Sequence, residues 1–151
     1  MTEGDRLRAE DLHPGQVLAL GSHKVTEDEI VEFAAAWDPQ DFHVDRELAE
    51  KRAYGGLIAS GIHTMAIYQR LAVNGVLRRL PVIAGKRLAD TVFLRPVRPG
   101  DTLTGKMIVD AVDFDDRGRA LITSTGELDN AEGKAVFRTV VEAYVQASPA
   151  E

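Results

Sequence analysis

Residues 37–45, with the sequence WDPQDFHVD, place a carboxylate and an imidazole close together in the chain. A residue that precedes proline is disfavoured in the helical region, so we expect a helix to end at about Trp37 and Asp38 to lie in a turn. A short irregular loop then allows His43 to fold back toward Asp38, with one water between the two side chains. Because histidine titrates near neutral pH, a carboxylate and an imidazole that share a water are suited to general acid–base chemistry.

Both residues also have an ordinary structural interpretation. An aspartate before a proline is commonly a turn former, and a single histidine is more often a packed or solvated side chain than a catalytic one. The spacing of Asp38 and His43 by itself therefore leaves both interpretations open.

A second segment, GGLIASG at residues 55–61, precedes the mostly apolar residues 62–73. If a helix begins at Gly61, its first N–H groups have no intrahelical partner, and the glycines leave them accessible. Such a helix end binds a carbonyl oxygen that becomes negative during a reaction. The structural alternative is that Ser60 caps the helix with its side chain and that the glycines allow close packing. Both interpretations can hold together.

Three motifs in order, WDPQ-x-FHVD (37–45), YGGLIASGIHTM (54–65) and FLRPVRPGDTL (93–103), resemble the MaoC-like dehydratase family. This family includes (R)-specific enoyl-CoA hydratases with a hot-dog fold, and the resemblance covers nearly the whole chain. It implies that Asp38 and His43 hold and activate a water and that the Gly61 amide polarises a thioester carbonyl.

The resemblance implies reversible hydration of a trans-2-enoyl-CoA, or dehydration of an (R)-3-hydroxyacyl group on CoA or acyl carrier protein. Two alternatives stay open: a non-catalytic subunit that binds acyl thioesters, and a thioesterase on the same fold. Five residues are expected to contact the substrate, namely Ser60, Phe42, Tyr54, Arg95 and Arg98.

This chain departs from many of the relatives that it resembles. It has Pro39-Gln40 where many relatives carry Asn-Pro, and Ser60 where many carry His. Asp41 adds a further carboxylate beside the predicted site. These differences leave the reaction class in place and the substrate open.

Four cationic residues, Lys86, Arg87, Arg95 and Arg98, gather in the sequence near the predicted ligand groove. They would either bind substrate phosphates or form a solvated strand edge that discourages pairing between molecules.

The sequence contains no Gly-rich phosphate loop of the Walker or Rossmann type. A metal site of Asp38, His43, Asp45 and His63 matches no familiar ligand spacing. We therefore expect neither a cofactor nor a metal.

The chain of 151 residues, 44% hydrophobic and 28% charged, suits one soluble domain over residues 1–151. A net charge of −6 argues against nucleic acid or an anionic membrane as a partner. The absence of cysteine, of a signal peptide and of a membrane-length apolar stretch favours the cytoplasm. A single sheet with an unpaired edge favours a homodimer.

The pattern of elements predicts an α+β fold. Thr26 and Glu29 form a capping-box pattern before a helix that ends near Trp37, and Asp45 would cap a short helix that overhangs the site. Turns join the predicted strands, which cover residues 12–21 in part, 87–95, 102–112, 119–129 and 134–146. Residues 1–11 and 147–151 are expected to be loose.

The segment 61–75 has few charges and is expected to be a buried helix that a curved antiparallel sheet wraps. We expect Met65 and Tyr68 to be core or pocket wall, with core the stronger expectation. His63 on the same helix is expected to be a packed or partly buried histidine.

Overall fold

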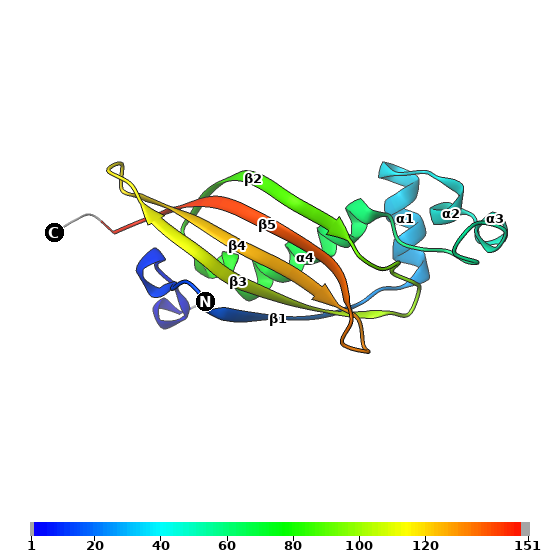
Figure 1. Ribbon diagram of the computed structural model, residues 1–151, viewed down its shortest axis with the longest axis horizontal. Coiled ribbons are helices and arrows are strands. Elements are labelled where there is room, and N and C mark those ends of the chain that lie inside the picture. Colours follow the sequence, from blue (N-terminus) through cyan, green and yellow to red (C-terminus); the bar gives the residue numbers. More distant parts are fainter. Residues whose placement is uncertain (1, 149–151) are drawn as a thin grey trace.

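The computed structural model describes residues 2–148, in which five antiparallel strands form one curved sheet around a long helix (Figure 1). The strand order is β1-β3-β4-β5-β2, so β1 and β2 are the two edges. A helix packed on one antiparallel sheet confirms the predicted α+β class and its central helix. The strands are β1 (Val17–Lys24), β2 (Val82–Phe93), β3 (Thr102–Phe114), β4 (Arg119–Asp129) and β5 (Ala135–Gln146).

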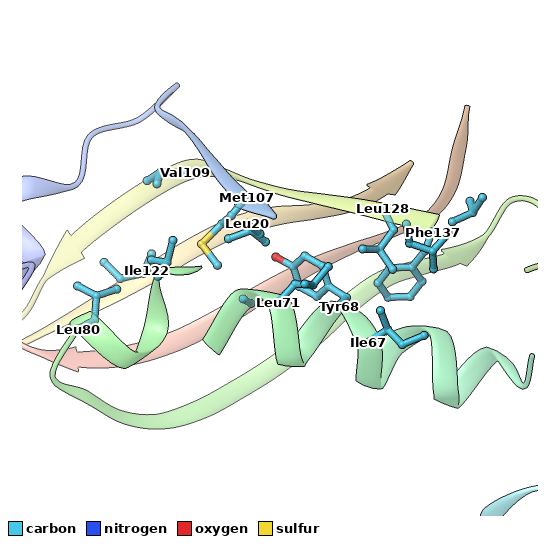
Figure 2. Close-up of a cluster of buried hydrophobic side chains, with 14 of the residues drawn as sticks. Leu20, Ile67, Tyr68, Leu71, Leu80, Met107, Val109, Ile122, Leu128 and Phe137 are labelled. Carbon is cyan, nitrogen blue, oxygen red and sulfur yellow. The ribbon is translucent and has the colours of Figure 1, made fainter. Parts of the chain in front are cut away.

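The central helix, α4 (Gly61–Gly75), has the bounds that its apolar pattern predicted. Figure 2 shows Ile67, Tyr68 and Leu71 reaching from α4 into the core between helix and sheet. Tyr68 lies so close to β4 that a Cβ added at Gly126 would overlap its hydroxyl oxygen. Glycine at this position of the sheet therefore makes room for the tyrosine, and burial raises the pKa of Tyr68.

The helix before the predicted site, α1 (Glu27–Trp37), begins with the predicted capping box. Thr26 Oγ1 accepts from the Glu29 N–H at 3.2 Å, and Glu29 Oε1 accepts from the Thr26 N–H at 2.7 Å. The helix ends at Trp37, as the following Asp-Pro predicted. These local patterns set where Asp38 leaves the helix.

Two short helices follow α1: α2 (Asp41–Val44), which we did not predict, and α3 (Arg46–Glu50). The Asp45 side chain accepts from the Leu48 N–H at 3.0 Å, which confirms the predicted cap of α3. A four-residue helix is too short to show a helical period in sequence. Together α1, α2 and α3 lie at one end of the sheet, beside the start of α4 (Figure 1).

The edge strand β2 starts at Val82, five residues before the predicted start at residue 87. Nearly all of its residues are exposed, so the strand lacks the in–out alternation that marks a half-buried strand. Its pairing with β5 is interrupted by bulges, one of them next to Asp90, whose φ is 48°. A bulged and exposed edge leaves little periodic signal in the sequence.

The N-terminal segment forms two 3-10 helices, Glu3–Asp5 and Ala9–Asp11, where its polar sequence had indicated no regular structure. Ala9 is fully buried, and Leu7 packs against the core. At the other end of the chain, the Ser148 N–H donates to Glu10 Oε1 at 2.9 Å. The remainder of the C-terminal tail that we expected to be loose lies outside the described residues. A third 3-10 helix, Leu77–Arg79, follows α4.

Candidate active site

Asp38 and His43 lie side by side at the end of α1, with His43 Nε2 3.4 Å from Asp38 Oδ2. Asp38 caps the C-terminus of α1 with a non-helical backbone, and its N–H donates to the Ala34 carbonyl at 2.8 Å. The helix α2, which was not predicted, turns the chain back toward Asp38. In this turn the His43 N–H donates to the Gln40 carbonyl at 3.0 Å. The His43 side chain is 5% exposed and the Asp38 side chain 23% exposed.

The ring of His43 is held by one strong hydrogen bond. His43 Nδ1 lies 2.6 Å from the carbonyl oxygen of Ile58, which only accepts, so Nδ1 carries the proton. In the neutral ring Nε2 then has the free lone pair, and it faces an oxygen of Asp38 that also accepts. Two acceptors this close need a hydrogen atom to lie between them. Either a proton on His43 Nε2 or a bridging water supplies it.

Asp38 receives two further hydrogen bonds. Ser60 Oγ donates to Asp38 Oδ2 at 2.7 Å, and Gln40 Nε2 donates to Oδ1 at 2.8 Å. The Ser60 hydroxyl and, after it, the Gln40 amide hold the pKa of the Asp38 carboxyl below its usual value. Sequence reasoning noted Gln40 only as a departure from a motif and missed it as a partner of Asp38.

The expectation that the Ser60 side chain caps α4 is wrong. Ser60 is the N-cap residue by position, but its side chain makes no capping hydrogen bond. Its hydroxyl instead donates a hydrogen bond to the Asp38 carboxylate, 22 residues away in the sequence. No side chain of the described chain therefore caps the first N–H groups of α4, which also lack intrahelical partners.

Gly61 opens α4 beside this pair and lies against the ring of Phe93. A Cβ added at Gly61 would stand 2.9 Å from two carbon atoms of that ring. Phe93 is half-exposed at the end of β2, and its ring also lies 5.7 Å from that of Phe137 in the core. Sequence reasoning missed Phe93, because a contact between an edge strand and a helix end leaves no local pattern.

Backbone hydrogen bonds join the three sequence motifs into one site. The Ile58 N–H donates to the Phe42 carbonyl at 3.3 Å, and the Ala59 N–H donates to the Val97 carbonyl at 2.8 Å. With the bond from His43 to the Ile58 carbonyl, the segment before α4 is tied to both neighbouring motifs.

A cavity of about 510 Å³ opens in front of Asp38, His43 and Gly61. Three of the five residues predicted to contact substrate, Phe42, Tyr54 and Arg95, line it. Arg98 lies apart, in a neighbouring depression, where its side chain donates to the Tyr54 carbonyl at 2.8 Å. Ser60 is 0% exposed, behind the Asp38 carboxylate. The other lining residues include Ile62, Thr64, Leu94 and Val136.

The charges around the cavity fall into two groups. Arg52 is hydrogen-bonded to the Asp41 carboxylate and lowers its pKa, so Asp41 does not enter the site as a free carboxylate. Among residues 2–148, no carboxylate lies within ion-pair distance of Arg95 or Arg98. The four cations that are close in sequence are divided in space, because Lys86 and Arg87 line a different cavity.

That second cavity, of about 400 Å³, lies farther along the same side of α4. Residues between Tyr68 and Ala72 on the helix and between Val82 and Leu88 on β2 line this cavity. The lining is mostly apolar. Tyr68 is thus both core and pocket wall, and its hydroxyl is buried without a hydrogen-bond partner in the described structure.

Glu29 joins two other histidines near the start of α4. His23 Nε2 lies 2.9 Å and His63 Nε2 3.3 Å from Glu29 Oε2. His63 is buried and stacks on Phe33 at 4.7 Å, as expected of a packed histidine, and burial lowers its pKa.

Over residues 2–148, no three His, Cys, Asp or Glu side chains are arranged to hold a metal ion. Within the same range, no helix has the length and apolar character to cross a membrane.

Comparison with known proteins places these features in a family. The sequence model described as "MaoC like domain" matches residues 11–131. The uncharacterized protein YdeM of Bacillus subtilis (strain 168) is 39% identical over 97 residues, which make up 64% of this chain and 69% of YdeM.

Solved structures agree with this match. The crystal structure of a MaoC-like dehydratase from Rhodospirillum rubrum has a TM-score of 0.86 and 35% identity, over 95% of this chain and 99% of that one. R-hydratase PhaJ1 from Pseudomonas aeruginosa has a TM-score of 0.75 and 21% identity, over 97% and 93% of the two chains. At that identity the second similarity shows the fold alone. The expected hot-dog fold is thereby confirmed.

Proposed function

Because the chain belongs to the MaoC-like domain family, we propose that it catalyses the reversible addition of water to a trans-2-enoyl thioester of CoA or acyl carrier protein. One observation carries the proposal. His43 Nε2 and Asp38 Oδ2, both acceptors, lie 3.4 Å apart at a cavity that also contains Gly61. A water on the cavity side of the pair donates one hydrogen bond to each and turns its oxygen toward a bound substrate.

Three groups carry the reaction. As the water oxygen bonds to Cβ of the substrate, His43 Nε2 takes a proton from the water. The electrons of the double bond move toward the thioester oxygen, which gains negative charge and accepts a hydrogen bond from the Gly61 N–H. The imidazolium then returns its proton to Cα, so that water has been added across the double bond. Dehydration is the same sequence in reverse.

Asp38 has a different part from His43 in this scheme. Its pKa lies below the usual value, because the Ser60 hydroxyl and the Gln40 amide donate to it. It therefore stays ionised and orients the water, while His43 moves the proton.

The cavities suit the two ends of an acyl thioester. The cavity along α4 is proposed to take the acyl chain, since most of its lining is apolar, although Lys86 and Arg87 also belong to it. Arg95 and Arg98 donate to the Ala135 and Tyr54 carbonyls and have no carboxylate partner among the described residues, so they are proposed to bind phosphates of the thiol carrier. We further propose that residues 1–151 act as one domain in the cytoplasm.

Two other functions on this fold make different predictions. A thioesterase would release free thiol, and a non-catalytic binding subunit would give no turnover. The deciding experiment follows the absorbance of the conjugated bond in a panel of 2-enoyl-CoA esters and measures thiol in parallel. Loss of the band without thiol supports hydration. Thiol release, or binding without turnover, would refute it.

Filling the acyl cavity should shorten the accepted substrates. Gly85 lines this cavity, and a Cβ added there meets no atom within 4 Å. We expect Gly85→Leu to lower kcat/KM for long-chain enoyl-CoA roughly 10-fold relative to four-carbon crotonyl-CoA, a typical value for steric exclusion from an apolar pocket. Ala84→Leu on the same strand is the control, since Ala84 does not line the cavity. Equal losses for all chain lengths would place the acyl chain elsewhere.

We also predict that the protein is a homodimer joined through β2. This edge strand exposes Val82, Ile83, Leu88, Val92 and Phe93 to solvent. An exposed apolar edge invites pairing with another strand, and a symmetric partner covers both edges at once. Light scattering at micromolar concentration should give about twice the chain mass of 16.5 kDa. A mass near 16.5 kDa would rule the dimer out.

A further inference from the structure

We infer that Ser60 is a positioning residue, whose hydroxyl fixes the Asp38 carboxylate in the orientation that leaves His43 Nε2 free to accept from water. The inference rests on the proposed function. It assigns Ser60 neither to substrate contact nor to helix capping, the two roles that its sequence position had indicated.

The geometry singles out one oxygen of Asp38. Oδ2 receives the Ser60 hydroxyl at 2.7 Å and is also the oxygen that lies 3.4 Å from His43 Nε2. Oδ1 receives the Gln40 amide at 2.8 Å. With one donor on each oxygen, the plane of the carboxylate is fixed from two sides. The lone pairs that remain on Oδ2 are available to a water on the cavity side.

The Ser60 side chain does not help to start α4, because its hydroxyl makes no capping hydrogen bond there. The start of the helix rests on the backbone instead. The Ser60 carbonyl accepts from the Thr64 N–H at 3.0 Å and from the Thr64 hydroxyl at 3.3 Å. Both bonds use main-chain atoms of residue 60 and survive the loss of the Ser60 hydroxyl.

The position of Ser60 also keeps Asp38 an acceptor. His43 is the titratable group that faces Asp38, while Ser60 and Gln40 are uncharged donors. If the Ser60 donor is lost, the pKa of Asp38 rises toward its usual value. A protonated Asp38 would donate to His43 Nε2 and occupy the lone pair that the water needs. The Ser60 hydroxyl therefore helps to keep that lone pair free.

The test compares Ser60→Ala and Ser60→Thr with wild-type protein. We expect Ser60→Ala to lower kcat by roughly 10-fold to 10²-fold, the scale of a small misplacement of a reacting group. The Asp38 carboxyl should titrate at higher pH in this variant, because the donor that contributes most to its lowered pKa is gone. Ser60→Thr keeps the donor and should keep the wild-type titration of Asp38.

Thr139→Val is the matched control. Thr139 is buried like Ser60, and its hydroxyl is hydrogen-bonded to that of Thr91 at 2.8 Å, away from the site. This variant should change the melting temperature without moving the titration of Asp38. A folded Ser60→Ala protein with wild-type kcat and an unmoved Asp38 titration would overturn the inference. If Ser60→Ala does not fold, Ser60→Cys replaces it, since a thiol of similar size is a weak donor.

A second readout separates this inference from the proposed function. The ¹³C resonance of the Asp38 carboxyl, assigned by its loss in Asp38→Asn, reports its titration without substrate. A higher Asp38 pKa in Ser60→Ala than in wild type supports the role of Ser60 in holding the carboxylate, even if no enoyl thioester is turned over. Turnover by the wild type with no change in this titration would leave the proposed function standing and reject the inference.

Discussion

Replacing either Asp38 or His43 should lower kcat for the best enoyl-CoA by roughly 10²–10⁴, the range for a lost general acid or base. Asp38→Asn keeps the shape of the side chain but removes the ionised carboxylate that accepts hydrogen bonds from Ser60 and Gln40. His43→Gln removes the ring that lies between the Ile58 carbonyl and Asp38. The two variants thus remove opposite sides of the proposed water site.

The double variant gives the sharper test. Because Asp38 and His43 act on the same water in the proposed mechanism, Asp38→Asn/His43→Gln should be hardly slower than either single variant. Independent structural roles would instead add, and would appear mainly in the melting temperature. Steady-state kinetics and thermal unfolding, measured on the same preparations, separate the two outcomes.

The chain supplies matched controls for both substitutions. Asp41→Asn removes a neighbouring carboxylate whose partner is Arg52. His23→Gln removes a histidine that is hydrogen-bonded to Glu29. Neither change touches the Asp38–His43 pair, so both variants should retain most of the wild-type kcat. Wild-type turnover by a folded Asp38→Asn or His43→Gln protein would end the mechanism, although the fold would stand.

Gly61→Val should also lower kcat strongly, by about 10²–10³, which is the usual loss when one oxyanion donor fails. The new side chain would stand between the α4 amide and the space where the thioester oxygen is proposed to lie. It would also meet the Phe93 ring, since a Cβ at Gly61 already falls 2.9 Å from it. Overpacking of that kind costs about 1–3 kcal/mol of stability.

A second substitution distinguishes the clash from the loss of the amide. Gly61→Val/Phe93→Ala removes the ring and should regain most of the melting temperature. It should not regain kcat, because the valine still screens the N–H group. Phe93→Ala alone is the control. Recovery of wild-type kcat in the double variant would show that the ring contact, and not the amide, explains the loss.

Local sequence patterns determined the elements that carry the site. The capping box of Thr26 and Glu29 and the Asp-Pro step set the two ends of α1. The apolar stretch after Ser60 gave the bounds of α4, Gly61–Gly75, and alternation with turn residues gave β4, Arg119–Asp129. Each of these features depends on residues a few positions apart, which a sequence displays directly.

The short spacing of Asp38 and His43 also indicated that His43 could fold back toward Asp38, and the two side chains do lie together. In the same way, the motif resemblance located the glycine that begins α4. Three of the five residues expected to contact substrate line the cavity, and they come from motifs whose backbones are hydrogen-bonded to one another.

Tertiary structure decided which partners those groups have. The Ser60 hydroxyl could cap its own helix or reach Asp38, 22 residues away, and only the packing of α1 against the start of α4 selects Asp38. The proton on His43 Nδ1 follows from a main-chain carbonyl at Ile58, whose direction no side-chain pattern encodes. Phe93 meets Gly61 because a bulged edge strand ends there. A sequence lists donors and acceptors, but contacts between distant segments decide how they pair.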